Sequence, residues 1–169
     1  MGIRYWGRPL PTRFVATAQR NPRLLQIDDE YDDYLWALDD DDREFPYLSP
    51  ERRHSLDLDK SFNDFQRLWD IEPRGSRCAI ELVRGQVTTT MRGHRPHYGI
   101  VTFDRLTSIR TDVTRTGRDE ISAFIRAGFG RYRDAPSSYV DSLICYRDAM
   151  LTFLDARLLR MEGVIYTIG

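Results

Sequence analysis

Apolar residues recur along this chain with two different periods, and the changes of period predict where helices and strands lie. Residues 3–10 mix aromatic and branched side chains with polar ones and then meet Pro9 and Pro11, a pattern typical of a strand that ends at the prolines. An apolar spacing of three or four positions predicts helices over the following ranges: 12–20, 23–38, 60–69, 104–114 and 119–132.

Two further segments carry helix-start signals. Ser49 precedes Pro50 and Glu51, which together supply a hydroxyl N-cap, a first-turn proline and a first-turn acid. Ser137 or Ser138 begins the longest predicted helix, whose apolar stripe continues to residue 161 and requires burial. We expect Gly163 to end this helix as its C-cap.

The period becomes two after Arg77, which predicts strands. The runs 78–83, 87–91 and 97–103 are rich in branched and aromatic residues and predict an antiparallel meander. Residues 164–168 form a last, short apolar run that we expect to lie centrally in the sheet.

These elements predict an α+β fold for the whole chain. A length of 169 residues suits a single domain with one main core, and we expect residues 1–169 to form it. The sheet should be small and mostly antiparallel, with several helices packed on it, including a long C-terminal helix followed by a last strand. The sequence contains no internal repeat.

Composition narrows the class of protein. Hydrophobic residues make up 41% and charged residues 30%, and the mean hydropathy is -0.53, which excludes a disordered or membrane-embedded composition. No apolar run approaches the roughly 18 residues that a membrane-spanning helix needs, and residues 1–10 lack the apolar core of a signal peptide. We therefore expect a cytoplasmic protein.

The net charge of -1 conceals an uneven distribution. Residues 28–44 contain ten acids against one base, whereas the rest of the chain has 24 bases against 16 acids. Aromatic side chains within the acidic segment supply contact area and carboxylates steer association, so we predict a docking surface for a basic protein. The alternative is a solvated loop. The predicted contact residues are Tyr31, Tyr34, Trp36, Asp39, Asp40, Asp41 and Asp42.

A second polar cluster surrounds the only lysine of the chain, Lys60. If the segment is helical, Asp57 and Asp64 lie three and four positions from Lys60 and bracket it on one face. Such a group supports acid–base chemistry if burial separates the pKa values. The alternative is a capped helix with a structural salt bridge. The predicted ligand-binding residues are Asp57, Asp59, Lys60, Glu81 and Thr88.

Other candidate chemistry is weaker. Cys78 and Cys145 lie among apolar residues and are expected to be buried free thiols, and His94 and His97 lack further ligands at regular spacing, so we predict no metal site and no cofactor. No nucleophile elbow or phosphate-binding loop is present in the sequence. Arginines interleave with aromatics at residues 4–6 and 131–133 and can stack on bases, but the acidic segment would repel a polyanion, and we do not expect nucleic-acid binding.

Four stretches together resemble a known family. They are residues 1–6 (MGIRYW), 56–62 (LDLDKSF), 81–88 (ELVRGQVT) and 161–168 (MEGVIYTI), and in order and spacing they are similar to the YfbM-like family of small uncharacterised bacterial proteins. Members usually have tryptophan at the position of Phe62 and a histidine shortly after it, where this chain has Asn63 and Asp64. The resemblance implies a compact α+β fold in the bacterial cytoplasm and implies no reaction. Some relatives lie beside toxin systems, in which small proteins act as immunity partners.

The sequence therefore predicts a non-enzymatic, cytoplasmic module that binds another protein, such as an immunity-type partner of a toxin. We expect that partner to carry a basic surface. The alternative is a small-molecule-binding protein or an enzyme with a polar pocket around Asp57, Asp59 and Lys60.

Overall fold

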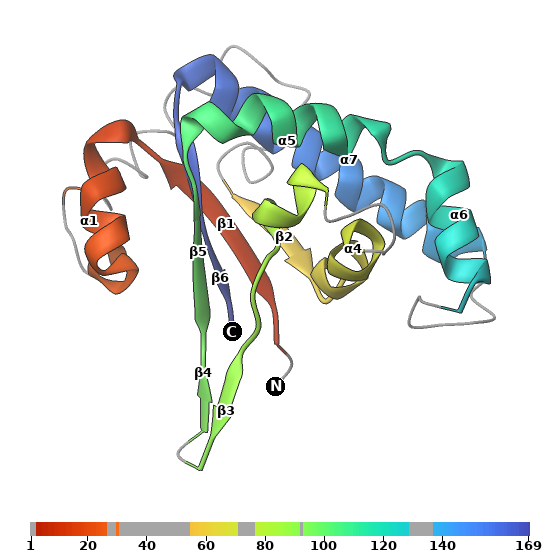
Figure 1. Ribbon diagram of the computed structural model, residues 1–169, viewed down its shortest axis with the longest axis horizontal. Helices are drawn as coiled ribbons and strands as arrows, with labels where there is room; N and C mark the ends of the chain where they lie inside the picture. The colour runs from red at the N-terminus through yellow and green to blue at the C-terminus, as the bar shows by residue number, and fades with distance from the viewer. Residues whose placement is uncertain (1–2, 27–29, 31–54, 71–76, 92, 129–136) are drawn as a thin grey trace.

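Four strands form an antiparallel sheet at the centre of the molecule (Figure 1). The computed structural model describes residues 3–26, 30, 55–70, 77–91, 93–128 and 137–169. The strands are β1 (Tyr5–Leu10), β2 (Leu56–Asp59), β5 (His97–Val101) and β6 (Gly163–Ile168), in the spatial order β2-β1-β6-β5. The last strand thus lies inside the sheet, as its apolar sequence predicts, and the α+β fold class is confirmed.

Helices cover the two faces of this sheet unequally. The larger layer contains α4 (Phe62–Trp69), α5 (Phe103–Arg115), α6 (Arg118–Arg126), α7 (Ser137–Arg160) and the short 3-10 helix η4 (Cys78–Leu82). The smaller layer contains η1 (Thr12–Phe14), α1 (Val15–Arg20) and η2 (Pro22–Gln26). In Figure 1, α1 lies beside the end of β1 that leads into it, on the opposite side from α4, α5 and α7. The predicted helices over 12–20, 60–69 and 104–114 are present, and the one over 119–132 is helical to Arg126.

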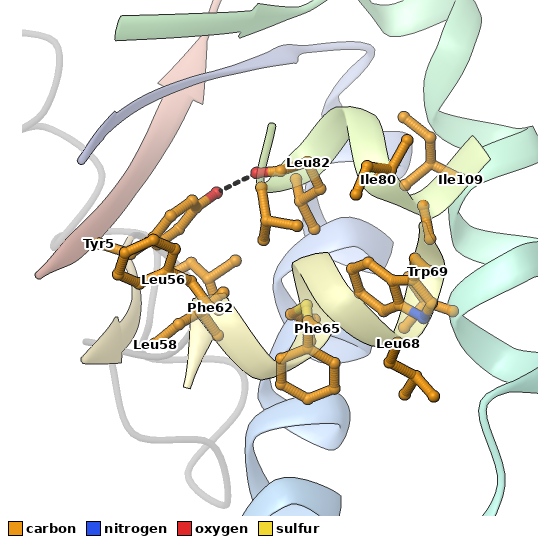
Figure 2. Packing of buried hydrophobic residues seen from close by; sticks show 14 of the residues in the cluster. Tyr5, Leu56, Leu58, Phe62, Phe65, Leu68, Trp69, Ile80, Leu82 and Ile109 are labelled. Atoms are coloured by element: carbon orange, nitrogen blue, oxygen red, sulfur yellow. Dashed lines mark hydrogen bonds between the residues drawn. The ribbon is translucent and has the colours of Figure 1, made fainter. Parts of the chain in front are cut away.

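Successive side chains along each strand point to opposite faces of the sheet and contribute to two separate cores. Tyr5 on β1 and Val164, Tyr166 and Ile168 on β6 belong to the large core beneath α4, α5 and α7. Leu10 and Ile165 point the other way and join a small core with Phe14, Ala18 and Leu25. Figure 2 shows the large core, in which strand and helix side chains pack against one another. The described residues consequently cover one face of the sheet well and only part of the other.

Two buried tyrosines fasten η4 to the sheet. The Tyr5 hydroxyl donates a hydrogen bond of 2.8 Å to the Leu82 carbonyl (Figure 2), and the Tyr166 hydroxyl lies 3.0 and 2.8 Å from the carbonyls of Glu81 and Arg84. The two rings stack with centroids 5.3 Å apart. Burial raises the pKa of both phenols, so both remain protonated donors.

The predicted strand over residues 78–83 is wrong, because that segment is the 3-10 helix η4. Buried residues fall on both sides of the alternation, Ala79 and Val83 on one side and Ile80 and Leu82 on the other, which does not match the half-exposed pattern of a surface strand. Tertiary contacts fix the helical conformation: the Asp112 carboxylate accepts from the Ala79 amide at 2.9 Å, and Arg77 forms ion pairs with Asp112 at 2.8 Å and Glu120 at 2.7 Å.

The predicted three-strand meander is also wrong. Strands β3 (Thr88–Thr90) and β4 (Gly93–Arg95) pair with each other in a separate hairpin, and β5 pairs with β6. Figure 1 shows this hairpin projecting from the end of the sheet. The sequence pattern predicted β3 and β5 near their observed positions but carried no information on their partners.

Gly163 does not end α7 as its C-cap. The left-handed residue after the helix is Met161, with a φ of 55°, and Gly163 is already the first residue of β6. A Cβ on Gly163 would lie 2.5 Å from the carbonyl oxygen of Val101 on the neighbouring strand. The glycine is needed here because two backbones approach closely.

The cysteine prediction is wrong as well. Cys78 and Cys145 are free thiols, as expected, but both are exposed. Cys145 follows the buried Leu143 on α7 by two positions, and a helix turns by more than half a revolution over that distance, so the thiol emerges on the outer face.

A buried ion pair spans the end of α7. Arg157 is fully buried and its Nη1 lies 3.0 Å from Oε2 of Glu162, whose side chain is also buried. The Glu162 amide donates to the Arg157 carbonyl at 3.0 Å and holds the turn between α7 and β6. Burial raises the pKa of Glu162 from 4.5 to about 7.

Raising the pH should therefore destabilise the protein through Glu162. Because its pKa is raised in the folded state, its contribution to stability is complete below about pH 4.5 and is lost as the pH rises through about 7. Urea denaturation at pH 5 and pH 8 should show a fall in the free energy of unfolding of the wild type that exceeds that of Glu162→Gln by roughly 1–3 kcal/mol. Equal falls in the two proteins would show that another group causes the pH dependence.

Candidate binding site on the open face of the sheet

A pocket of about 140 Å³ lies on the less covered face of the sheet. Strand residues form its floor and η2 forms one wall. The described residues that line it are Trp6, Arg8, Pro22, Leu25, Tyr98, Ile165 and Thr167. The pocket thus joins three strands and a 3-10 helix that are distant from one another in the sequence.

The strand register places two aromatic residues on either side of a small one. Thr167 on β6 pairs with Trp6 on β1 and with Tyr98 on β5, so the three residues form one row across the sheet. Cross-strand partners share a face, and the row therefore presents two ring systems with a threonine between them. Trp6 is 45% exposed, although a large apolar side chain is normally buried.

The alternation of β1 explains why these side chains face solvent. Tyr5, Gly7 and Pro9 point towards the large core, which leaves Trp6 and Arg8 on the opposite face. The described residues of the small core cover the Leu10 end of that face, and Trp6 is not among them.

Arginine supplies the charge of the pocket. Arg8 is exposed and makes no ion pair with any residue that the structure describes. Arg23 on η2 places its guanidinium carbon 5.9 Å from the centroid of the Tyr98 ring, within the range of a cation–π contact. No described lining residue is acidic, so the pocket favours a ligand with negative charge.

The five predicted ligand-binding residues do not meet in one pocket lined by described residues. Asp57 and Asp59 lie on β2, where Oδ1 of Asp57 accepts from the Asp59 amide at 2.7 Å. Asp59 also forms an exposed ion pair of 3.5 Å with Arg4. Lys60 follows the strand and is exposed. The helical face that would place these residues together is therefore not formed.

The other members of that group have separate roles. Glu81 on η4 forms an ion pair of 2.5 Å with Arg105, and Thr88 is exposed on the β3–β4 hairpin. Asp64 on α4 is buried and accepts a 2.7 Å hydrogen bond from the Tyr139 hydroxyl of α7. Of the five predicted ligand-binding residues, Asp57 lies next to the pocket on the open face of the sheet, because its register partner on β1 is Trp6.

Several sequence predictions lie outside the described residues. These include the whole predicted protein-docking surface of Tyr31, Tyr34, Trp36 and Asp39 to Asp42, most of the helix over 23–38 and the helix start at 49–51. They stay predictions. His94 is on the exposed β4, and His97 is on β5 with its ring centroid 6.3 Å from that of Tyr166. Within the described ranges, no three His, Cys, Asp or Glu side chains come together as metal ligands.

No family model, curated protein or solved structure matches this chain. The resemblance to the YfbM-like family therefore stays a prediction that rests on four short segments of the sequence. Across the described part of the chain, no helix is both long enough and apolar enough to cross a membrane.

Sequence reasoning missed the pocket as a site. It noted the interleaved arginine and aromatic residues at 4–6, but nothing in the sequence connects Trp6 with Tyr98 or Thr167. The usable signal was the alternation of β1, which predicts that Trp6 and Arg8 share a face. The partners on β5 and β6 become apparent only from the strand register.

Proposed function

We propose that this protein is a non-enzymatic module that binds a protein partner on the open face of the sheet. The observation that carries the proposal is the exposed Trp6 beside Tyr98 and Arg8 around one pocket. Tryptophan, tyrosine and arginine are the residue types that contribute most binding energy at protein interfaces, especially around a pocket that excludes water. The exposure of Trp6 at the border of this pocket supports the proposal, because it leaves an aromatic side chain available for contact.

The chemistry of the pocket supports binding better than catalysis. Its charged group is an arginine, which stays protonated at all physiological pH values and is a poor proton donor or acceptor. Thr167 supplies a hydroxyl, but no described lining residue is a histidine or carboxylate that would activate it. The resemblance to the YfbM-like family suggests one form of this function, in which this protein is the immunity-type partner and the protein that it binds is a toxin.

The proposal is tested by affinity capture from a lysate of the source cell, followed by reconstitution of the complex from purified proteins. We expect Trp6→Ala to lose the captured partner, because the truncation removes the exposed aromatic anchor. The matched control is Leu159→Ala, which shortens an apolar side chain on α7 that is 80% exposed, and it should retain the partner.

Two outcomes would contradict this function. One is that no protein forms a stable complex, and the other is that Trp6→Ala and the wild type bind the partner equally well. A third variant, in which Asp39 to Asp42 are replaced by asparagine, separates the two surfaces. If only this variant loses the partner, the acidic segment is the contact surface and the sheet face is not.

A further inference from the structure

The strand register sets the spacing between the two aromatic residues of the row. Trp6 and Tyr98 are separated by the single strand that carries Thr167, which sets their backbones about 9.6 Å apart at two strand spacings. Aromatic rings in contact have centroids about 4.5–7 Å apart. Two such contacts in succession therefore fit within this row if a ring from a ligand stands between Trp6 and Tyr98.

The remaining lining residues define the chemistry around that ring. Pro22, Leu25 and Ile165 provide apolar walls, and the Thr167 hydroxyl provides one hydrogen-bonding group at the floor. Arg8 lies two positions from Trp6 on the same face of β1, and Arg23 lies against the Tyr98 ring. A ligand that fits this lining therefore carries its negative charge on groups beside the inserted ring and not on the ring itself.

We propose that the pocket receives one aromatic side chain from an acidic segment of the protein partner. The ring inserts between Trp6 and Tyr98 over Thr167, and neighbouring carboxylates pair with Arg8 and Arg23. This inference rests on the proposed function and adds the chemistry of the partner to it. The predicted ligand is acidic, in contrast to the basic partner that the segment 28–44 predicts, so the two surfaces would bind different chemistry.

A nucleotide also combines a flat ring with negative charge, but the lining fits it less well. A base has several polar groups on its edges, and apolar walls would leave most of them without hydrogen-bond partners. A phenyl, phenol or indole ring has at most one such group, which the Thr167 hydroxyl can satisfy.

Fluorescence anisotropy with labelled peptides tests the proposal directly. The probes carry one tyrosine or one tryptophan flanked on each side by two glutamates, and the comparison peptides replace the aromatic residue by alanine or the glutamates by lysine. We expect the acidic aromatic probes to bind with a dissociation constant below about 1 mM. Each comparison peptide should bind about tenfold more weakly or worse, because it lacks either the ring or the carboxylates.

Variants of the chain locate the binding. Trp6→Ala and Arg8→Glu should each weaken the acidic aromatic probe about tenfold, and Arg8→Glu should also reduce the salt dependence. Arg126→Glu reverses an exposed charge on α6 and should change binding less than about twofold. Thermal unfolding of each variant checks that the fold is retained.

The outcomes separate this inference from the proposed function. Absence of binding up to about 1 mM, equal binding of the lysine peptide, or tighter competition by adenosine monophosphate than by the acidic aromatic peptide would overturn it. If a protein partner is captured in a Trp6-dependent manner while the peptides fail, the binding function stands and only the chemistry of the occupant is wrong. If no partner is captured but the peptides bind as expected, the pocket chemistry stands without the proposed function.

Discussion

Replacing Trp69 with alanine should lower the free energy of unfolding by about 3–5 kcal/mol. Trp69 is completely buried at the end of α4, its ring lies 5.0 Å from that of Phe65, and its Nε1 donates a 3.0 Å hydrogen bond to Oγ1 of Thr116. The truncation leaves a large cavity where α4 meets α5, and it also leaves the Thr116 hydroxyl without this donor. Chemical denaturation at constant pH measures the loss.

Trp6→Ala is the matched control for this prediction. The same side chain is removed at a position that is 45% exposed, so the expected change in the free energy of unfolding is within about 1 kcal/mol. The two tryptophans should therefore have opposite effects. Trp69→Ala should impair folding, whereas Trp6→Ala should impair binding in a folded protein. A large loss of stability in Trp6→Ala would show that this residue is structural.

Gly99→Ala should be the second strongly destabilising change. A Cβ at Gly99 on β5 would lie 1.9 Å from Cζ of Tyr166 on β6. The Tyr166 ring is held by its hydroxyl contacts with the carbonyls of Glu81 and Arg84, so it cannot move aside without breaking them. We expect a loss of about 2–4 kcal/mol in the free energy of unfolding, with overpacking and broken hydrogen bonds both contributing.

Gly117→Ala provides the comparison for Gly99→Ala. A Cβ at Gly117 meets no atom of the described residues within 4 Å, and the residue precedes α6 with an ordinary backbone conformation. Its expected effect is within about 1 kcal/mol, because only helix capping and chain entropy change. If both alanine variants lose stability equally, the close approach of Gly99 to Tyr166 is not the cause.

The sequence predicts those elements whose pattern is local. The alternation before Pro9 gives β1, the spacing of Leu106, Ile109 and Val113 gives α5, and the apolar run after Gly163 gives β6. Each of these patterns extends over only a few helical turns or a single strand. Over that distance, backbone geometry alone determines which residues share a face.

The errors arise where distant contacts decide the structure. Residues 78–82 are helical because Asp112 and the two buried tyrosines hold them, and these partners lie more than thirty residues away. The candidate site has the same origin, since Trp6, Tyr98 and Thr167 become neighbours only through strand register. A polar cluster that is compact in sequence, around Lys60, is by contrast split between a strand, a turn and a helix.

The pairing of β1 with β6 sets an order for the assembly of the protein during its synthesis. Among the described strands of the main sheet, only β6 pairs with β5. β6 also pairs with β1, on the side of β1 that faces away from β2. Until residues 163–168 have left the ribosome, the helices can form but the sheet lacks its interior strand, and Tyr5 has no Tyr166 to stack upon. Before β6 has been synthesised, β1 and β5 each present an unpaired edge that could pair with other chains, a hazard that chaperones are suited to limit.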